Sequence, residues 1–269
     1  MKVGIIGMGM VGGAVAAATT KNCVLATYDK YKPNLSANTN SIFQSDIIFV
    51  CVPTPTNQGV QDIAELITVC LQLSQVGFNG VVAVKSTVLP GTMGLLQKRF
   101  TDLRLVHNPE FLSEKTAHAD FKNQKDVLVS GNMKDAAAVT DYCFTVGINA
   151  NIWYNADFTV TEAAKYIHNC SLPVILSLLN EMYDVFGDEV YKDAIEMAHL
   201  FGNVPRHHKV PGPDGLRGWG GMCFPKDTIA FYIWARSKGH KMPTLNGSLL
   251  TNLTHRSEEM RKCMKKSGK

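Results

Sequence analysis

One cysteine stands in a setting that favours chemistry. Cys223 lies in the segment GWGGMCFPKD at residues 218–227, with glycines before it and Pro225, Lys226 and Asp227 after it. Proline suits the first turn of a helix, so Cys223 is expected just before a helix N-terminus, where the helix dipole favours a thiolate. Lys226 adds positive charge, and Asp227 can receive or relay a proton. The alternative is a buried structural cysteine in a glycine-rich turn.

A glycine pattern predicts a dinucleotide site. Gly7, Gly9 and Gly12 form GxGxxG directly after the apolar run Val3–Ile6 and at the start of an alanine-rich helix. The first glycine permits a tight turn, and the second lets a pyrophosphate approach the backbone. The third allows the helix to pack closely, and the helix N-terminus faces the phosphates.

An acidic residue extends this prediction. Asp29 ends the next apolar run, 22 residues after Gly7, where a carboxylate that binds the ribose is expected. Such a carboxylate disfavours a 2′-phosphate, so the sequence favours NAD over NADP as the cofactor. Lys30 follows directly and weakens that preference, because a lysine attracts phosphate.

The pattern of apolar runs in the first half of the chain predicts the fold that positions these residues. Short apolar runs alternate with helix-length segments such as 62–75 and 92–100, a pattern that indicates a parallel sheet covered on both faces. We therefore predict an α/β fold in which residues 1–156 form a Rossmann-like, doubly wound NAD-binding domain. The expected strands are Val3–Ile6, Cys23–Tyr28, Asp46–Val52, Val81–Val84, Leu103–Val106 and Val127–Val129.

The second half predicts a long central helix and a small all-α domain over residues 157–269. Apolar positions at helical spacing indicate one helix over Thr161–Phe186, in which Pro173 should open or kink the backbone. The glycine- and proline-rich segment 202–221 reads as a functional loop, in which His207 and His208 are expected to be solvated. The further expected helices are Asp188–Leu200, Lys226–Lys238 and Gly247–Lys262.

Composition excludes several classes of protein. The chain has 269 residues, of which 45% are hydrophobic and 19% charged, as in a folded globular protein. A net charge of +4 suits a phosphorylated small molecule but is too weak to predict a nucleic-acid partner. The seven cysteines contain no CxxC pair, so no metal site is predicted. Without a signal sequence or a membrane-spanning run, a cytoplasmic location is expected.

Five ordered motifs resemble those of one known family, the UDP-glucose/GDP-mannose dehydrogenases. The segment around Cys223 is similar to that family's GGxCxPKD, and the resemblance extends from Gly7 to Asp227. The other motifs are CVPTPT at 51–56 with Asp62, KSTVLPGT at 85–92, NPEFLSE at 108–114, and TEAAK at 161–165 with Asn169, Asn180 and Glu181.

The resemblance implies NAD-linked oxidation of a nucleotide sugar, such as UDP-glucose, from primary alcohol to acid. Cys223 would form a thiohemiacetal and then a thioester, while Lys165 and Asn169 stabilise negative charge from one helix face. Glu114 would act on the hydrolytic water, with Thr87 and Asp227. The implied cofactor-binding residues are Gly7, Gly9, Met10, Val11, Gly12, Asp29, Pro53, Thr54, Thr87 and Lys226, and the implied substrate-binding residues are Glu110, Phe111, Leu112, Lys165 and Gly220.

Each role has a plainer alternative. Lys165 and Asn169 suit solvent-facing positions on a helix, Thr87 suits a helix cap, and Glu110 suits the cap of a short helix near Phe111. Glu110 and Glu114 have the i,i+4 spacing of one helix face.

The sequence departs from the family in three places. The family's C-terminal α/β domain, which completes the nucleotide site, is not present in these residues. Ser113 and Lys115 stand where the family has a basic residue and a glycine, and Gln124–Asp126 replaces a PDR pattern. These departures weaken the prediction of the substrate more than the prediction of the cofactor.

Three functions remain in competition. The first is a nucleotide-sugar 6-dehydrogenase that is a homodimer, as the family is. The second is a dehydrogenase of the 3-hydroxyacid type that performs a single oxidation without covalent catalysis. The third is a non-catalytic NAD-binding or assembly protein. Cys223 in its motif favours the first.

Overall fold

The structure is a computed structural model that describes residues 1–19, 22–32, 34, 39–202 and 209–264. His207 and His208 lie outside the described residues. The chain forms two compact units. Unit 1 contains residues 1–54 and 62–165, and unit 2 contains residues 55–61 and 166–269.

Unit 1 is built on a seven-stranded sheet with the order β2-β1-β3-β6-β7-β8-β9. Neighbouring strands are parallel except for β7 and β8, which pair in antiparallel fashion. The sheet is therefore mixed rather than wholly parallel. Its strands are β1 (Lys2–Ile6), β2 (Val24–Tyr28), β3 (Ile47–Val50), β6 (Val81–Val84), β7 (Arg104–His107), β8 (Asp126–Gly131) and β9 (Asn151–Asn155).

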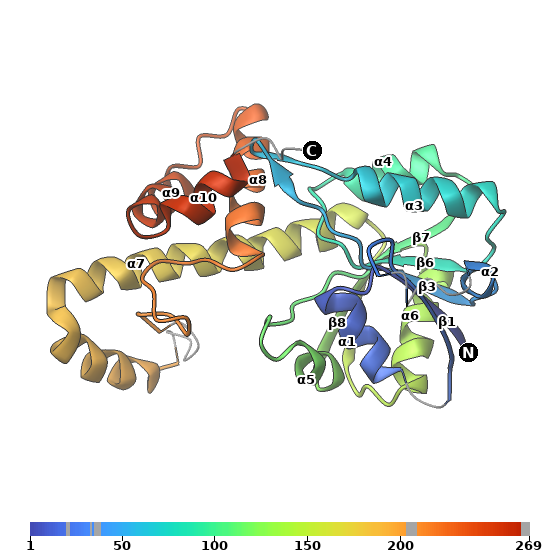
Figure 1. Ribbon diagram of the computed structural model, residues 1–269, viewed down its shortest axis with the longest axis horizontal. Helices are drawn as coiled ribbons and strands as arrows, with labels where there is room; N and C mark the ends of the chain where they lie inside the picture. The colour runs from blue at the N-terminus through green and yellow to red at the C-terminus, as the bar shows by residue number, and fades with distance from the viewer. Residues whose placement is uncertain (20–21, 33, 35–38, 203–208, 265–269) are drawn as a thin grey trace. The chain divides into compact units, whose positions relative to one another are not determined.

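Helices cover both faces of this sheet (Figure 1). Helices α1, α5 and α6 cover one face, and α2, α3 and α4 cover the other. Strands β1, β3 and β6 send alternate side chains to the two faces and are almost fully buried, which explains their continuous apolar sequences. The helices are α1 (Met10–Ala18), α2 (Thr39–Ile42), α3 (Ala64–Gln75), α4 (Thr92–Arg99), α5 (Ala117–Lys122) and α6 (Met133–Thr145).

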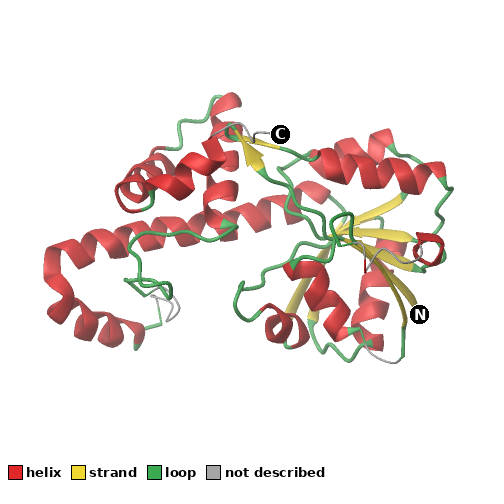
Figure 2. Cartoon of the chain, viewed as in Figure 1, coloured by secondary structure: helices red, strands yellow, loops and turns green. Residues whose placement is uncertain are grey.

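Unit 2 is mainly helical (Figure 2). The long helix α7 begins in unit 1 and continues through unit 2, where a small core around Trp219 joins the later helices. A short hairpin packs against α8 and α10. The elements are β4 (Thr56–Asn57), β5 (Val60–Gln61), α7 (Phe158–His199), α8 (Phe224–Ser237), α9 (Pro243–His255) and α10 (Ser257–Met264).

The structure confirms the predicted fold class and refines several boundaries. Helix α7 is interrupted at Gly187, whose φ is 75° and ψ 166°, so the two helices expected on either side of it are present. The segment expected as one helix over Gly247–Lys262 is divided at Arg256. The hairpin β4–β5 was not expected. The domain boundary after residue 156 stays a prediction, since the compact units divide within α7.

Pro173 does not interrupt α7. Gly187 is the one residue with non-helical dihedral angles that the structure records within α7. Proline has a φ near −65°, which is already the helical value, so its dihedral angles fit the helix, and the kink expected at Pro173 stays a prediction. Among the described residues, no helix is both long and apolar enough to cross a membrane.

Candidate active site

The loop between β1 and α1 has the geometry expected of a nucleotide-binding turn. Gly7 has a φ of +92°, and a Cβ there would lie 2.7 Å from the Cys51 carbonyl oxygen. A Cβ on Gly12 would lie 1.9 Å from the Gly7 carbonyl oxygen, so only glycine lets α1 approach the turn. Around Gly9, no described atom lies within 4 Å of the same position. The second glycine thus leaves the backbone open where a pyrophosphate would lie.

Asp29 directly follows β2 and is fixed against this loop. Its carboxylate accepts hydrogen bonds from the Met8 amide at 2.7 Å and from the Tyr31 amide at 2.8 Å. Met10 and Val11 form the first turn of α1, whose amide groups are the partners that phosphate prefers at a helix N-terminus. The residues present therefore fit a dinucleotide.

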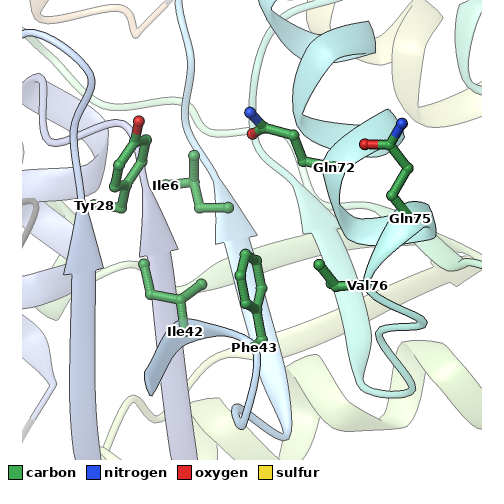
Figure 3. Close-up of a pocket in the computed structure, with 7 residues that line it drawn as sticks. All are labelled: Ile6, Tyr28, Ile42, Phe43, Gln72, Gln75 and Val76. Atoms are coloured by element: carbon green, nitrogen blue, oxygen red, sulfur yellow. The ribbon is translucent and has the colours of Figure 1, made fainter. Parts of the chain in front are cut away.

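A pocket of about 210 Å³ lies on the face of the sheet between α2 and α3 (Figure 3). Ile6 and Tyr28, the last residues of β1 and β2, form part of its lining, and Tyr28 immediately precedes Asp29. Gln72 and Gln75 of α3 contribute amides to the opposite side. Sequence reasoning did not find this pocket, because no local pattern marks it. The other lining residues are Ile42, Phe43 and Val76.

The loops that follow β3 and β6 are tied together beside the glycine turn. Thr54 Oγ1 donates to the Thr87 carbonyl at 2.7 Å, and Ser86 Oγ donates to the Val52 carbonyl at 2.7 Å. Thr54 and Thr87 are buried, whereas Pro53 is exposed. These loops lie at the carboxyl ends of parallel strands, where α/β sheets bind ligands.

Lys165 and Glu110 form a buried ion pair in unit 1. Lys165 Nζ lies 3.5 Å from Glu110 Oε1 and also donates to the Glu110 carbonyl oxygen. The two side chains are 4% and 7% exposed, so Lys165 is not the solvent-facing lysine of the plainer interpretation. The Phe111 ring lies below the ammonium group, with its centroid 4.9 Å away. The other oxygen of Glu110 accepts from the Leu112 amide at 2.7 Å.

Glu114 has a different environment from Glu110. Residues 110–113 are not helical, and Glu114 lies exposed in the turn before α5. Their i,i+4 spacing therefore does not place them on one helix face. Glu110 also does not cap a helix, because α5 begins only at Ala117. Its role in the structure is to hold Lys165 and the turn at Leu112.

Two buried polar residues behind this pair were not found from the sequence. Lys85 Nζ donates to the Asn108 carbonyl at 3.1 Å and to Asn108 Oδ1 at 3.0 Å, and Asn108 in turn donates to the Leu128 carbonyl at 2.8 Å. Burial lowers the pKa of Lys85. These bonds join the residues that follow β6 and β7 to the middle of β8, directly before Glu110. Lys85 and Asn108 appear in the quoted motifs, but their contact joins residues that are distant in sequence.

His107 is also buried beside this group. Its Nδ1 lies 2.8 Å from Thr161 Oγ1, which lies 2.6 Å from Ser130 Oγ. Burial, together with the positive charges of Lys85 and Lys165, lowers the pKa of His107 to about 3. The imidazole is therefore neutral at pH 7.

In unit 2, Cys223 immediately precedes α8, as the sequence predicted. Pro225 occupies the first turn, and the Asp227 amide donates to the Cys223 carbonyl at 2.9 Å. Asp227 is 1% exposed and accepts from Asn169 Nδ2 at 2.8 Å and from Lys226 Nζ at 2.5 Å. The amide of Asn169 is therefore buried and fixed, not solvated.

The glycine-rich loop before Cys223 is held by two buried asparagines. Asn252 exchanges two hydrogen bonds with the backbone of Trp219, whose ring is 2% exposed and serves as a packing anchor. Asn180 Oδ1 accepts from the Gly218 amide at 2.8 Å. Asn252 carried no signal in the sequence, because a polar residue within a helix resembles a surface position.

Gly220 lies close to the side chains of Glu259 and Arg256. A Cβ on Gly220 would lie 2.2 Å from Glu259 Oε2 and 2.8 Å from Arg256 Nη1. Arg256 also donates to the Arg217 carbonyl at 2.7 Å and pairs with Asp214 at 2.7 Å. A side chain at the position implied as a substrate contact would therefore have to displace the ends of Glu259 and Arg256.

The predicted residues accordingly form two groups. Unit 1 contains the glycine loop, Asp29, the paired loops and the Glu110–Lys165 pair. Unit 2 contains Cys223, Asn169, Asp227, Gly220 and Lys226, the last of which was implied as a cofactor contact and is paired with Asp227. Among the described residues, no cluster of three or more histidine, cysteine, aspartate or glutamate side chains is arranged to hold a metal ion.

Two sequence profiles match the chain. The profile of the UDP-glucose/GDP-mannose dehydrogenase family NAD binding domain matches residues 25–146, and that of the same family's central domain matches residues 159–253. The chain belongs to this family. Unit 1 therefore carries the family's NAD-binding domain.

Individual relatives agree with this assignment. The chain is 30% identical over 239 residues to a UDP-glucose 6-dehydrogenase of Haloferax volcanii, a match that covers 79% of this chain and 53% of the relative. The chain thus spans about half the length of the curated relatives that it matches. A UDP-glucose dehydrogenase of Pyrobaculum islandicum has the same fold, with a TM-score of 0.80 and 23% identity over 94% of this chain and 68% of its own.

The fold is also similar to that of a shorter enzyme. A 3-hydroxyisobutyrate dehydrogenase of Mycobacterium tuberculosis matches with a TM-score of 0.73 and 15% identity, over 96% of this chain and 94% of its own. At this identity the likeness shows the fold alone. The two-domain plan is therefore common to dehydrogenases that act on different substrates.

Proposed function

We propose that this protein is an NAD-dependent dehydrogenase that oxidises the primary alcohol of a nucleotide sugar, such as UDP-glucose, to the acid. The observation that carries the proposal is the setting of Cys223. It precedes the N-terminus of α8, and one turn later Asp227 is buried between Asn169 and Lys226. A helix N-terminus favours the thiolate form of a cysteine. This arrangement supplies a nucleophile with fixed polar groups near it.

The cofactor site supports the same proposal. Gly7, Gly9 and Gly12 leave room for a pyrophosphate, and Asp29 is fixed where it can accept the ribose hydroxyls. The pocket beside Tyr28 offers apolar and aromatic walls and two amides, which suit the adenine ring. When bound, NAD accepts a hydride in each of the two oxidations.

In the proposed reaction, each of the implied catalytic residues has a defined task. Cys223 Sγ adds to the carbonyl carbon of the aldehyde to give a thiohemiacetal, and oxidation of this adduct gives a thioester. Lys165 and Asn169 donate hydrogen bonds to the oxygen on which negative charge develops. Water then cleaves the C–S bond, which releases the acid and returns the thiol. Glu114, with Thr87 and Asp227, directs that water and accepts its proton.

A single oxidation of a 3-hydroxyacid is the second candidate, because the two-domain fold is compatible with it. A single hydride transfer forms no covalent intermediate, so that reaction has no use for a nucleophilic thiol. A non-catalytic NAD-binding protein is the third candidate. The buried bonds of Lys165, Asn169 and Asp227 argue against it, because such groups are costly to keep without a function.

One experiment separates the three candidates. The protein is incubated with NAD and a panel of UDP-sugars, GDP-sugars and 3-hydroxyacids, and NADH is counted per substrate molecule for native protein and for Cys223→Ser. Two equivalents of NADH, lost in Cys223→Ser but retained in the matched control Cys263→Ser, are expected. Cys263 is also half-buried, so it controls for the loss of a thiol. One equivalent that is unaffected by Cys223→Ser would support the 3-hydroxyacid type, and retained NAD binding without turnover would support the third candidate.

We also propose that a second copy of the chain covers an apolar stripe on α7. Leu178, Met182 and Val185 are exposed at helical spacing, so they form one face of the helix. A homodimer would bury this face. Light scattering of the native protein is expected to give twice the chain mass, and Met182→Glu is expected to give the monomer. A native monomer would contradict the proposal.

A further inference from the structure

Two lysines follow Asp29 at the end of β2, and both are engaged by other groups. Lys30 Nζ lies 2.8 Å from Glu65 Oε1, in the first turn of α3. Lys32 Nζ donates to the Met8 carbonyl at 2.5 Å. An ammonium group at this position is the natural partner of a phosphate on the adenosine ribose, because the residues after β2 meet that ribose. In the structure, both ammonium groups instead contact oxygen atoms of the protein.

Glu65 also binds the residue between these lysines. Tyr31 Oη donates to Glu65 Oε1 at 3.3 Å, and Lys30 Nζ lies 5.4 Å from the centroid of the Tyr31 ring. The hydrogen bond and charge of Glu65 raise the pKa of Lys30, so the lysine stays protonated while a carboxylate offsets its charge. One side chain of α3 thus engages both residues that follow Asp29.

We propose that Glu65 is a specificity-determining residue for the cofactor: by pairing with Lys30 it makes the site accept the free ribose hydroxyls of NAD and reject the 2′-phosphate of NADP. The inference rests on the proposed cofactor site. A 2′-phosphate carries a charge of about −2, which would lie close to the carboxylates of Asp29 and Glu65. Lys30 could offset them only by leaving Glu65.

Asp29 cannot turn away from such a phosphate. Both of its oxygens accept backbone amides, one from Met8 and one from Tyr31, and the residue is 8% exposed. Discrimination between NAD and NADP then has two parts. Asp29 repels the phosphate directly, and Glu65 withholds the cation that would counteract this repulsion. Because Lys30 and Glu65 are both partly exposed, the second part is worth a few-fold in affinity rather than orders of magnitude.

The test is a calorimetric titration of native protein and Glu65→Gln with NAD and with NADP at low salt. In Glu65→Gln, we expect NADP to bind about threefold to fivefold more tightly, while the affinity for NAD changes by less than about twofold. The gain should vanish in the double variant Glu65→Gln with Lys30→Met, because Lys30 supplies it. It should also shrink at about 0.5 M salt, where exposed charges are screened.

Asp102→Asn is the matched control. Asp102 is exposed just before the amino end of β7, whereas the glycine loop follows the carboxyl end of β1, and its substitution also removes one negative charge. An unchanged ratio of NADP to NAD affinity in Glu65→Gln would overturn the inference. So would the same gain in Asp102→Asn, or a gain that survives Lys30→Met.

The titration also separates this inference from the proposed reaction. If native protein binds neither cofactor, both the cofactor site and the role of Glu65 are overturned. If it binds NAD but produces no NADH with any sugar, only the proposed oxidation fails. The role of Glu65 is then still decided by the affinities.

Discussion

Asn169 and Asp227 are joined by a hydrogen bond between two buried side chains: Asn169 Nδ2 donates to Asp227 Oδ2 at 2.8 Å. The second oxygen of Asp227 binds Lys226 at 2.5 Å. Helix α7 and the start of α8 are thereby connected through one carboxylate. Since Cys223 lies one turn before Asp227, this connection also fixes the beginning of the helix that carries the thiol.

Replacing Asp227 with asparagine should destabilise unit 2. One of its two acceptor positions becomes an amide group, which cannot accept a hydrogen bond from Asn169 or Lys226. A buried donor left without its acceptor costs about 1–3 kcal/mol. Urea unfolding should show this loss in Asp227→Asn, whereas Asp193→Asn, at an exposed position on α7, should stay within about 0.5 kcal/mol of native. Equal stability of the two variants would contradict the assignment.

Two alanine substitutions in the glycine loop should affect different properties: Gly12→Ala the stability of the fold, and Gly9→Ala the affinity for NAD. In Gly12→Ala, the added Cβ would lie 1.9 Å from the Gly7 carbonyl oxygen, so the helix must shift at a cost of about 1–3 kcal/mol. Gly9→Ala meets no described atom within 4 Å, so its stability should stay within about 1 kcal/mol of native. Its methyl group nevertheless occupies the space proposed for the pyrophosphate.

Thermal unfolding and calorimetry distinguish the two variants. Gly9→Ala should lose at least about tenfold in affinity for NAD while it remains folded, because the backbone can no longer approach the phosphates. Native affinity in Gly9→Ala would mean that the cofactor does not lie against this loop.

The stability of unit 1 should fall as the pH falls, because of His107. The pKa of His107 is lowered to about 3 by burial and by Lys85 and Lys165, whereas an unfolded histidine has a pKa of about 6.5. Between these values the unfolded chain binds a proton that the folded chain does not. The contribution is complete above about pH 6.5, and about 2 kcal/mol is lost on going to pH 5.

Unfolding in urea at pH 7.5, 6.5 and 5 provides the measurement. The free energy of unfolding should depend less steeply on pH in His107→Gln than in native protein, although the variant is less stable at pH 7.5. His118→Gln, at an exposed position on α5, should keep the native slope. If His107→Gln keeps it as well, the imidazole is not the group that titrates.

Gly220→Ala should impair turnover without affecting the cofactor. Its Cβ would lie 2.2 Å from Glu259 Oε2 and 2.8 Å from Arg256 Nη1, so either these paired side chains or the loop must move. A displacement of about 1 Å near a reacting group can cost about 100-fold in rate. We expect kcat to fall by about tenfold or more with NAD affinity unchanged, and Gly247→Ala, which meets no described atom within 4 Å, to be neutral. Native kcat in Gly220→Ala would show that the loop tolerates the shift.

The sheet was predictable where its strands are buried on both faces. Strands β1, β3 and β6 consist almost entirely of apolar residues, so sequence alone identified them. Strand β9 was missed because Trp153 and Tyr154 are exposed and give no buried pattern. The hairpin β4–β5 was missed because its turn is Gln58–Gly59, where both residues have positive φ but the common Asn-Gly signal is absent.

The site was predictable where its chemistry is local. The approach of Gly12 to the Gly7 carbonyl depends on backbone sterics within six residues, and Cys223 depends on the helix start beside it. The prediction that Glu110 and Glu114 share one helix face was wrong, because the segment that contains them is not helical. The contact of Lys85 with Asn108 and the bonds of Asn252 join residues 23 and 33 positions apart, which no local pattern encodes.

Strand β2 has a consequence for handling the protein. In the described part of the chain it pairs only with β1, and Val24 and Leu25 are 67% and 40% exposed. An edge strand with apolar side chains and no charged residue is a template on which other chains can add strands. Aggregation at high concentration should therefore begin here, and Leu25→Lys should raise the solubility limit while leaving the folded sheet intact.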